Sequence, residues 1–241
     1  MGLTIGVLAL QGDFAEHCAA LRRLGVPARE ARTGRDLDGV AGLIIPGGES
    51  TTIGRLVERF ELAEPIRSLA RAGMPVWGTC AGLILLAREV DPETRARHQP
   101  LLGLLDITVR RNAFGSQRES FECDLLVEPL GPPPLRAVFI RAPVVSVVGP
   151  GVEVLARLPD DRPVAVRAGN VIGTAFHPEL TEDLRFHAWF CSLAERWGVR
   201  TACALRVLLA GDPAGGHRPG LPTSPSATHS RSSVPCSAAL R

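Results

Sequence analysis

Apolar runs alternate with amphipathic stretches through the first half of the chain. Four runs predict strands, three of them without polar alternation, as strands buried on both faces have: residues 3–10 (LTIGVLAL), 26–30, 39–46 (GVAGLIIP) and 74–80 (MPVWGTC). Between and after them, apolar residues recur at helical spacing over residues 13–25, 51–72 with a break near Pro65, and 81–90 (AGLILLAREV). This alternation of strands and helices predicts a parallel sheet with helices on both faces.

The second half of the chain has a different pattern. Between about residues 107 and 174 the apolar runs are short, β-rich and interrupted by Gly and Pro, which predicts antiparallel strands added to the parallel sheet or lying beside it. A last helix is predicted over about residues 182–197. The expected fold class is therefore α/β, a mostly parallel, mixed sheet flanked by helices with an added antiparallel portion.

The composition changes near residue 210, where Pro, Gly and Ser dominate and periodicity is lost. Such a segment cannot bury enough apolar surface to offset its ordering entropy. We therefore expect one folded domain over residues 1–200 and a disordered tail over 201–241.

Composition and charge narrow the function. The net charge of +2 is too close to balance to favour a nucleic-acid or membrane partner. The sequence contains Arg but no Lys, which excludes lysine Schiff-base chemistry. The six cysteines form no CxxC pair, so we expect free thiols rather than disulfides or a metal site. The first residues lack a signal-peptide pattern and no apolar run approaches the roughly 20 residues of a membrane span, so a cytoplasmic protein is expected.

Cys80 lies at the predicted junction of a strand and a helix, in VWGTCAGL. A sharp strand-to-helix turn requires small neighbours, and Gly78, Ala81 and Gly82 supply them. The helix N-terminus would favour the thiolate, and the Ala81 N–H is placed to stabilise an oxyanion. Cys80 is therefore the candidate nucleophile, although position alone leaves a buried structural cysteine as the alternative.

A candidate base follows the strand-like stretch NVIGTA, in FHPEL. A thiol nucleophile needs a general base, and the imidazole of His177 has a suitable pKa. The imidazole in turn needs an acceptor that fixes its tautomer, and Glu179 stands two residues further on, beyond the stiff Pro178. A lone solvated or capping His177 is the alternative.

The loop PGGEST (residues 46–51) follows a buried strand, with Ser50 or Thr51 expected to cap the next helix. Gly47 and Gly48 allow backbone N–H groups to turn toward an oxyanion or a carboxylate. The charged side chains of Glu49, Arg111 and Arg141 are candidates for binding the ammonium and carboxylate of a free amino acid.

Together these segments resemble the class I, or triad, glutamine amidotransferases, and most closely the glutaminase subunits of pyridoxal 5′-phosphate synthase. The matching segments are, in order, GVLALQGDFAEH, LIIPGGESTTI, GTCAGLILLA, RNAFGSQ, RESFE, VFIRAP and FHPELTED, which cover residues 1 to about 198.

The resemblance implies a flavodoxin-like fold that hydrolyses L-glutamine to L-glutamate and ammonia. It implies Cys80 as nucleophile, His177 as base and Glu179 as its orienter, without a metal or cofactor. Implied glutamine contacts are Gly48, Glu49, Ser50, Arg111, Ile140 and Arg141, with Gly47 and Ala81 at the oxyanion. The implied partner is a barrel-shaped synthase subunit that uses the ammonia to make pyridoxal 5′-phosphate for vitamin B6 biosynthesis.

Two departures and three alternatives remain at this point. Ser116 stands where the family often has a second Arg, and the tail has no counterpart. The alternatives are a glutaminase for another ammonia-using synthase, a stand-alone γ-glutamyl hydrolase, and a flavodoxin-like module without catalysis. The segments LALQG and FIRAP argue against the first. Activity of the isolated chain on longer γ-glutamyl substrates would indicate the second, and a glutaminase assay tests the third.

Overall fold

The computed structural model describes residues 3–111 and 120–209. The strands are β1 Ile5–Leu8, β2 Ala28–Ala31, β3 Gly42–Ile45, β4 Val76–Thr79, β5 Ala87–Val90, β6 Leu105–Arg110, β7 Ser120–Leu125, β8 Leu135–Ile140, β9 Val144–Val148, β10 Glu153–Arg157, β11 Pro163–Ala168 and β12 Val171–Thr174. The α-helices are α1 Phe14–Arg23, α2 Ser50–Arg59, α3 Ala63–Arg71, α4 Ala81–Leu86, α5 Pro92–Ala96 and α6 Arg185–Leu209, and the 3₁₀ turns are η1 Gly34–Leu37, η2 Glu128–Leu130 and η3 Pro178–Leu180.

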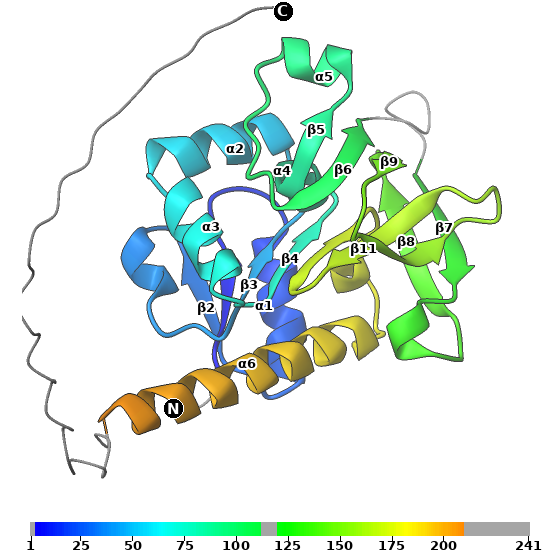
Figure 1. Ribbon diagram of the computed structural model, residues 1–241. Coiled ribbons are helices and arrows are strands. Elements are labelled where there is room, and N and C mark those ends of the chain that lie inside the picture. The colour runs from blue at the N-terminus through cyan, green and yellow to red at the C-terminus, as the bar shows by residue number, and fades with distance from the viewer. Residues whose placement is uncertain (1–2, 112–119, 210–241) are drawn as a thin grey trace, which may run out of the picture.

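A seven-stranded sheet forms the centre of the molecule, in the order β10-β11-β12-β4-β3-β1-β2 (Figure 1). The five strands from β12 to β2 are parallel, and β11 and β10 extend the sheet antiparallel to their neighbours. The parallel part has the flavodoxin-like strand order. Successive strands are added in one direction from β1 to β2 and in the other direction from β3 onward, so the topological switch point lies between β1 and β3. The predicted mixed α/β fold is confirmed, and the loops after β1 and β3 meet at the edge where such sheets bind ligands.

Helices cover both faces of the sheet, as the alternating side chains of β4 show. Trp77 is fully buried and its ring meets Phe186 and Phe190 of α6 at centroid distances of 4.7 and 5.6 Å. On the opposite face, a Cβ at Gly78 would lie 2.5 Å from the Gly82 backbone of α4. The apolar runs predicted as strands therefore form a core that is closed on both sides.

Two smaller sheets lie beside the main one and carry most of the predicted antiparallel portion. The hairpin β7-β8 pairs from Ser120–Ile140 to Leu125–Leu135, and β6 joins β5 and β9 in a second sheet. In Figure 1 the hairpin projects from the side of the molecule opposite α2 and α3.

The helix predicted over residues 81–90 is wrong beyond Leu86, because residues 87–90 form β5. The last carbonyls of α4 are taken by the incoming chain: Leu102 N–H donates to Leu85 O at 2.6 Å and Leu104 N–H to Leu86 O at 2.9 Å. These partners lie far along the chain, so the helical period of AGLILLAREV did not indicate where the helix ends.

The predicted helix over residues 51–72 is two helices, which meet at residues 60–62 rather than at Pro65. Glu61 adopts φ 54°, whereas Pro65 stands in the first turn of α3, where its missing N–H costs no hydrogen bond. The last helix starts near its predicted position but continues past Trp197 to Leu209, so the boundary predicted at residue 200 falls inside α6. Residues 210–241, which hold most of the predicted tail, lie outside the described residues.

Within residues 3–111 and 120–209, the structure contains no helix that is both long enough and apolar enough to cross a bilayer.

Candidate active site

Cys80 stands on a sharp turn between β4 and α4. Its backbone adopts φ 48° and ψ −98°, a strained conformation for a residue other than Gly, and its N–H donates to Thr174 O at 2.7 Å. The turn depends on small neighbours, because a Cβ at Gly82 would lie 2.2 Å from Ile45 O. The elbow expected from VWGTCAGL is present, and it directs the thiol to the carboxyl end of the parallel sheet.

His177 and Glu179 follow β12, the strand that pairs in parallel with β4 in the register Thr174–Thr79. The turn η3 brings the Glu179 carboxylate back onto the imidazole, and Nδ1 lies 2.7 Å from Oε1. Both residues are buried, with 3 and 8% of their surfaces exposed. Neighbouring strand ends thus bring together the three residues that were predicted to form a triad.

The charges in this cluster favour a protonated His177. Burial lowers the pKa of His177, but hydrogen bonding and charge from Cys80 and Glu179 outweigh burial and raise the pKa to about 11. Burial also raises the pKa of Glu179, against the opposing effect of His177. An imidazole that holds a proton beside a thiol stabilises the thiolate, which is the nucleophilic form of cysteine.

Cys18, Cys123 and Cys191 have surroundings that suppress the thiolate. Burial raises the pKa of Cys18 and of Cys123, and it raises the pKa of Cys191 to about 11. None of the three stands at a strand-to-helix elbow: Cys18 lies in α1, Cys123 in β7 and Cys191 in α6. The environment therefore distinguishes Cys80 as the candidate nucleophile.

The loops after β1 and β3 are in close contact beside the His–Glu pair. Asp13 N–H donates to Gly47 O at 3.1 Å, and Glu49 N–H donates to Gln11 Oε1 at 2.8 Å. Gly48 adopts φ 147°, a conformation that favours glycine. Gly47 lies directly against the His177 ring, since a Cβ there would come within 2.4 Å of Cε1. The predicted oxyanion loop therefore borders the candidate base.

Glu49, rather than Ser50 or Thr51, caps α2, which corrects the expectation from the sequence. Its carboxylate accepts the N–H groups of Thr51 at 3.3 Å and Thr52 at 2.6 Å. Arg111 Nη2 donates to the same carboxylate at 2.6 Å. The two side chains predicted to bind opposite ends of an amino acid are thus paired with each other in this structure.

The charge of Glu49 is expected to stabilise the fold in a pH-dependent way. Burial would raise the pKa of Glu49, but hydrogen bonds from Thr52 and Arg111 outweigh it and lower the pKa from 4.5 to about 2. A lowered pKa means that the ionised carboxylate stabilises the folded state above the unfolded-state pKa, and that this stabilisation is lost as the pH falls toward 2.

We therefore expect Glu49→Ala to lower the free energy of unfolding at pH 7 by about 1 kcal/mol, the usual value of a helix N-cap. The difference from the unsubstituted protein should shrink as the pH falls below 4.5. Denaturant unfolding across that pH range measures it. Glu58→Ala, at an exposed position of the same helix, is the control, and a pH-independent difference for Glu49→Ala would contradict the assignment.

Gln99 holds the start of α2 and was not foreseen from the sequence. Its amide Nε2 donates to Ser50 O, and its Oε1 accepts the hydroxyls of Ser50 at 2.8 Å and Thr51 at 3.1 Å. The contact spans 49 residues, and no local pattern around Gln99 indicates it. Ser50 is 1% exposed, and Gln99 fixes both its hydroxyl and its carbonyl.

The predicted contacts at the end of β8 also reach the site. Ile140 O lies 3.9 Å from Cys80 Sγ. Arg141 adopts φ 45° and is exposed, so its side chain extends from a strained turn beside the nucleophile. Residues 112–119, including Ser116 of the motif RNAFGSQ, lie outside the described residues.

Asp13 adds a second carboxylate that the sequence reasoning missed. Its Oδ2 lies 3.7 Å from His177 Nδ1. Asp13 is the N-cap residue of α1, but its side chain makes no cap hydrogen bond there. Asp13, His177 and Glu179 could together present ligand atoms to a metal ion. The imidazole nitrogen nearest both carboxylates already interacts with Glu179, an arrangement that suits an acid–base pair.

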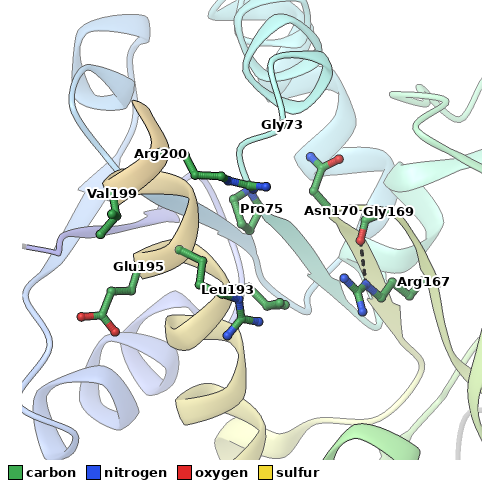
Figure 2. Close-up of a pocket in the computed structure, with 10 residues that line it drawn as sticks. Gly73, Pro75, Arg167, Gly169, Asn170, Leu193, Glu195, Val199 and Arg200 are labelled. Carbon is green, nitrogen blue, oxygen red and sulfur yellow. Dashed lines mark hydrogen bonds between the residues drawn. The ribbon is translucent and has the colours of Figure 1, made fainter. Parts of the chain in front are cut away.

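A pocket of about 780 Å³ lies at the other end of the sheet and contains no part of this site. Figure 2 shows its wall, where Arg167 Nε donates to Gly169 O at 2.6 Å and Arg200 extends from α6. Pro75 and Asn170 of the pocket precede β4 and β12, whereas Cys80 and His177 follow them. The pocket is therefore separate from the candidate active site.

Solved structures and curated sequences were compared with the chain. A structure titled "Crystal structure of glutamine amidotransferase" superposes with a TM-score of 0.74 at 53% identity, covering 79% of this chain and 98% of the other. A structure of PurLQS from Thermotoga maritima superposes with a TM-score of 0.54 at 18% identity, covering 84 and 100%, and supports the fold alone. The fold and the placement of a thiol beside a His–Glu pair define a glutamine amidotransferase of the class I type.

The chain belongs to the SNO glutamine amidotransferase family, whose sequence model matches residues 7–196. A protein of Herpetosiphon aurantiacus named pyridoxal 5′-phosphate synthase subunit PdxT is 58% identical over 191 residues, covering 79% of this chain and all of that protein. A protein of the same name from Roseiflexus castenholzii is 56% identical with the same coverage. These matches confirm the resemblance that the sequence segments indicated.

Proposed function

We propose that this chain hydrolyses L-glutamine through a Cys80–His177–Glu179 triad and delivers the ammonia to a synthase subunit that makes pyridoxal 5′-phosphate. The observation that carries the proposal is the convergence of an elbow cysteine and a His–Glu pair on adjacent strand ends. The names of the similar proteins support pyridoxal 5′-phosphate synthesis as the use of the ammonia.

In the proposed reaction, the Cys80 thiolate attacks the side-chain amide carbon of glutamine. Backbone N–H groups of the Gly47–Gly48 loop and of Ala81 stabilise the tetrahedral oxyanion. Protonated His177 donates its proton to the departing ammonia, and neutral His177 then removes a proton from the water that hydrolyses the glutamyl thioester. Glutamate leaves, and His177 keeps the proton taken from water, so the site returns to a Cys80 thiolate beside protonated His177.

The ion pair between Glu49 and Arg111 offers both signs of charge to the charged groups of the substrate. Glu49 and Arg111 now neutralise each other, with 43 and 20% of their side chains exposed. A zwitterionic amino acid can insert its ammonium toward Glu49 and its carboxylate toward Arg111 without leaving either charge alone. Gly48, Ser50, Ile140 and Arg141 surround this position and complete the proposed glutamine site.

The synthase is expected to control this reaction through Gln11. Gln11 does not cap α1, whose N-cap is Asp13; it instead accepts Glu49 N–H and so holds the glycine loop. A glycine peptide reorients at small cost, so docking of a partner at this edge can align the oxyanion N–H groups. Because only the transition state uses the oxyanion hole, the synthase should raise kcat far more than it lowers KM.

The test is steady-state glutamine hydrolysis with and without a saturating, barrel-shaped synthase subunit from the same source. We expect strong activation of the unsubstituted chain and weaker activation of Gln11→Ala, with unchanged alkylation of Cys80 in the isolated chain. Gly34→Ala, where a Cβ meets no atom within 4 Å, is the control. Equal turnover with and without the synthase would contradict activation by the synthase and favour a stand-alone hydrolase.

A further inference from the structure

The second oxygen of the Glu179 carboxylate faces a histidine from another part of the chain. Oε1 of Glu179 is held by His177, but Oε2 makes no hydrogen bond within the described ranges. The Nε2 atom of His17 lies 3.5 Å from Oε2, and both side chains are fully buried. A buried carboxylate oxygen without a donor is costly, so this contact requires an explanation.

His17 is fixed by contacts from two other elements, α6 and β4. Its Nδ1 lies 3.0 Å from His187 Nε2 of α6, and its Nε2 lies 3.2 Å from Thr79 Oγ1 at the end of β4. Its ring also meets Trp77 edge-on at a centroid distance of 5.4 Å. The imidazole therefore lies beside Oε2 of Glu179, whereas His177 binds Oε1, and its orientation is set by these contacts.

The proton positions in this group follow from charge and from the partners. Burial, followed by the neighbouring histidines His187 and His177, holds the pKa of His17 well below its usual value, and burial lowers the pKa of His187 to about 4. Both rings are therefore neutral near pH 7 and each carries one N–H. A lone pair on His17 Nε2 would face the Glu179 carboxylate, so its N–H belongs at Nε2, where Thr79 Oγ1 at 3.2 Å and Glu179 Oε2 at 3.5 Å are its two acceptors.

The assignment of the His17 proton to Nε2 also explains why Nδ1 of His187 has no hydrogen-bond partner among the described residues. With its proton at Nε2, His17 accepts at Nδ1, and His187 must donate from its Nε2. His187 Nδ1 is then a bare acceptor, and it is the His187 atom that has no partner in the part of the chain that is described. An unpaired acceptor is tolerated more readily than an unpaired N–H.

We propose that His17 is a positioning residue of the glutaminase, which donates its Nε2–H to Oε2 of Glu179 and so keeps Oε1 aligned with His177. The inference rests on the triad of the proposed function. His17 touches neither glutamine nor the reacting atoms, and it acts through Glu179. Hydrogen bonds of this kind are often long before the substrate binds and shorten when the imidazolium forms.

The role has two measurable consequences. Orientation of the base matters in the chemical step, so loss of the donor should lower kcat and leave KM nearly unchanged. The donor also stabilises the ionised form of Glu179, which His177 favours and which burial and Asp13 oppose. Without it, Glu179 takes up a proton at higher pH, so the acid limb of the kcat profile should move to higher pH.

The experiment compares His17→Leu with His17→Gln in the complex with the synthase. The glutamine side chain places its amide nitrogen as many bonds from Cβ as Nε2 of histidine, so it retains a donor for Glu179, whereas leucine does not. We expect His17→Leu to lose about tenfold or more in kcat, to keep KM within about threefold, and to shift the acid limb upward. His17→Gln should recover most of kcat and the position of the limb. Cys18→Ala, a buried change at the next position of α1, controls for general loosening.

Three outcomes would overturn the inference. One is a folded His17→Leu protein with unchanged kcat and acid limb. A second is a folded His17→Gln protein that is as impaired as the leucine variant. If His17→Leu does not fold, a His17→Gln protein with low kcat and a displaced limb counts against the inference by itself. Turnover by Cys80→Ala in the same assay would instead show that the proposed triad is wrong.

Discussion

Replacement of Cys80 by alanine is expected to abolish glutamine hydrolysis and to leave the fold and glutamine binding largely intact. The thiol supplies the electron pair for the first bond to the substrate, and no neighbouring side chain replaces it in that step. Because Cys80 occupies a turn whose backbone is set by Gly78 and Gly82, alanine can adopt the same path without new contacts. The measurement is glutamate release with the synthase present, together with glutamine binding by calorimetry.

A chloroketone analogue of glutamine provides the complementary measurement. It should alkylate Cys80 before Cys18, Cys123 and Cys191, since burial raises the pKa of each of those three thiols. Cys191→Ala is the matched control and should retain both activity and labelling. Glutamate release by Cys80→Ala at a rate near that of the unsubstituted chain would refute the assignment of the nucleophile.

The residues at the centre of the site could be predicted because their signals are local. Five consecutive residues around Cys80 indicate the elbow, and only Pro178, a rigid residue, separates His177 from Glu179. Their convergence followed from topology, since parallel strands carry their carboxyl ends to one edge. The loops after β1 and β3 meet at that edge for the same reason, and Gln11 and Glu49 join them.

The contacts around this centre could not be predicted, although Glu49, Ser50 and Arg111 were candidates, because the contacts join distant segments. Gln99 reaches Ser50, and Arg111 reaches Glu49 across 62 residues. The capping of α2 also depended on competition among three adjacent polar residues, which propensity does not resolve. The boundary between α4 and β5 was set by two N–H groups from a later loop.

His17 left a signal in the sequence that was not used. Helical spacing places it on the same face of α1 as Leu21, and both are fully buried. A polar side chain on the apolar face of a helix needs a buried partner, and a second histidine stands between apolar residues in α6. The pattern predicts a buried contact of this type, although it cannot name Glu179 as the third member.

Gly47→Ala is expected to reduce turnover by about 100-fold, the effect of moving a catalytic group by about an ångström. The added Cβ would lie 2.4 Å from Cε1 and 3.0 Å from Nδ1 of His177, and 3.0 Å from Asp13 Oδ2, so the ring must shift. Glu179 accepts from the same nitrogen, Nδ1, at 2.7 Å, so a shift of the ring disturbs the hydrogen bond that orients it. The substitution keeps the N–H of residue 47, so the loss cannot come from a missing oxyanion donor.

Kinetics and stability together distinguish displacement of His177 from a general defect. Overpacking of this kind costs about 1–3 kcal/mol in the free energy of unfolding, which a fold of this size tolerates. We therefore expect a folded Gly47→Ala protein with a large fall in kcat and slower alkylation of Cys80, because a displaced imidazolium stabilises the thiolate less. Gly34→Ala, whose Cβ enters open space, should match the unsubstituted protein in all three measurements. If Gly47→Ala keeps full turnover, the position of His177 seen here is not the one in which it acts as the base.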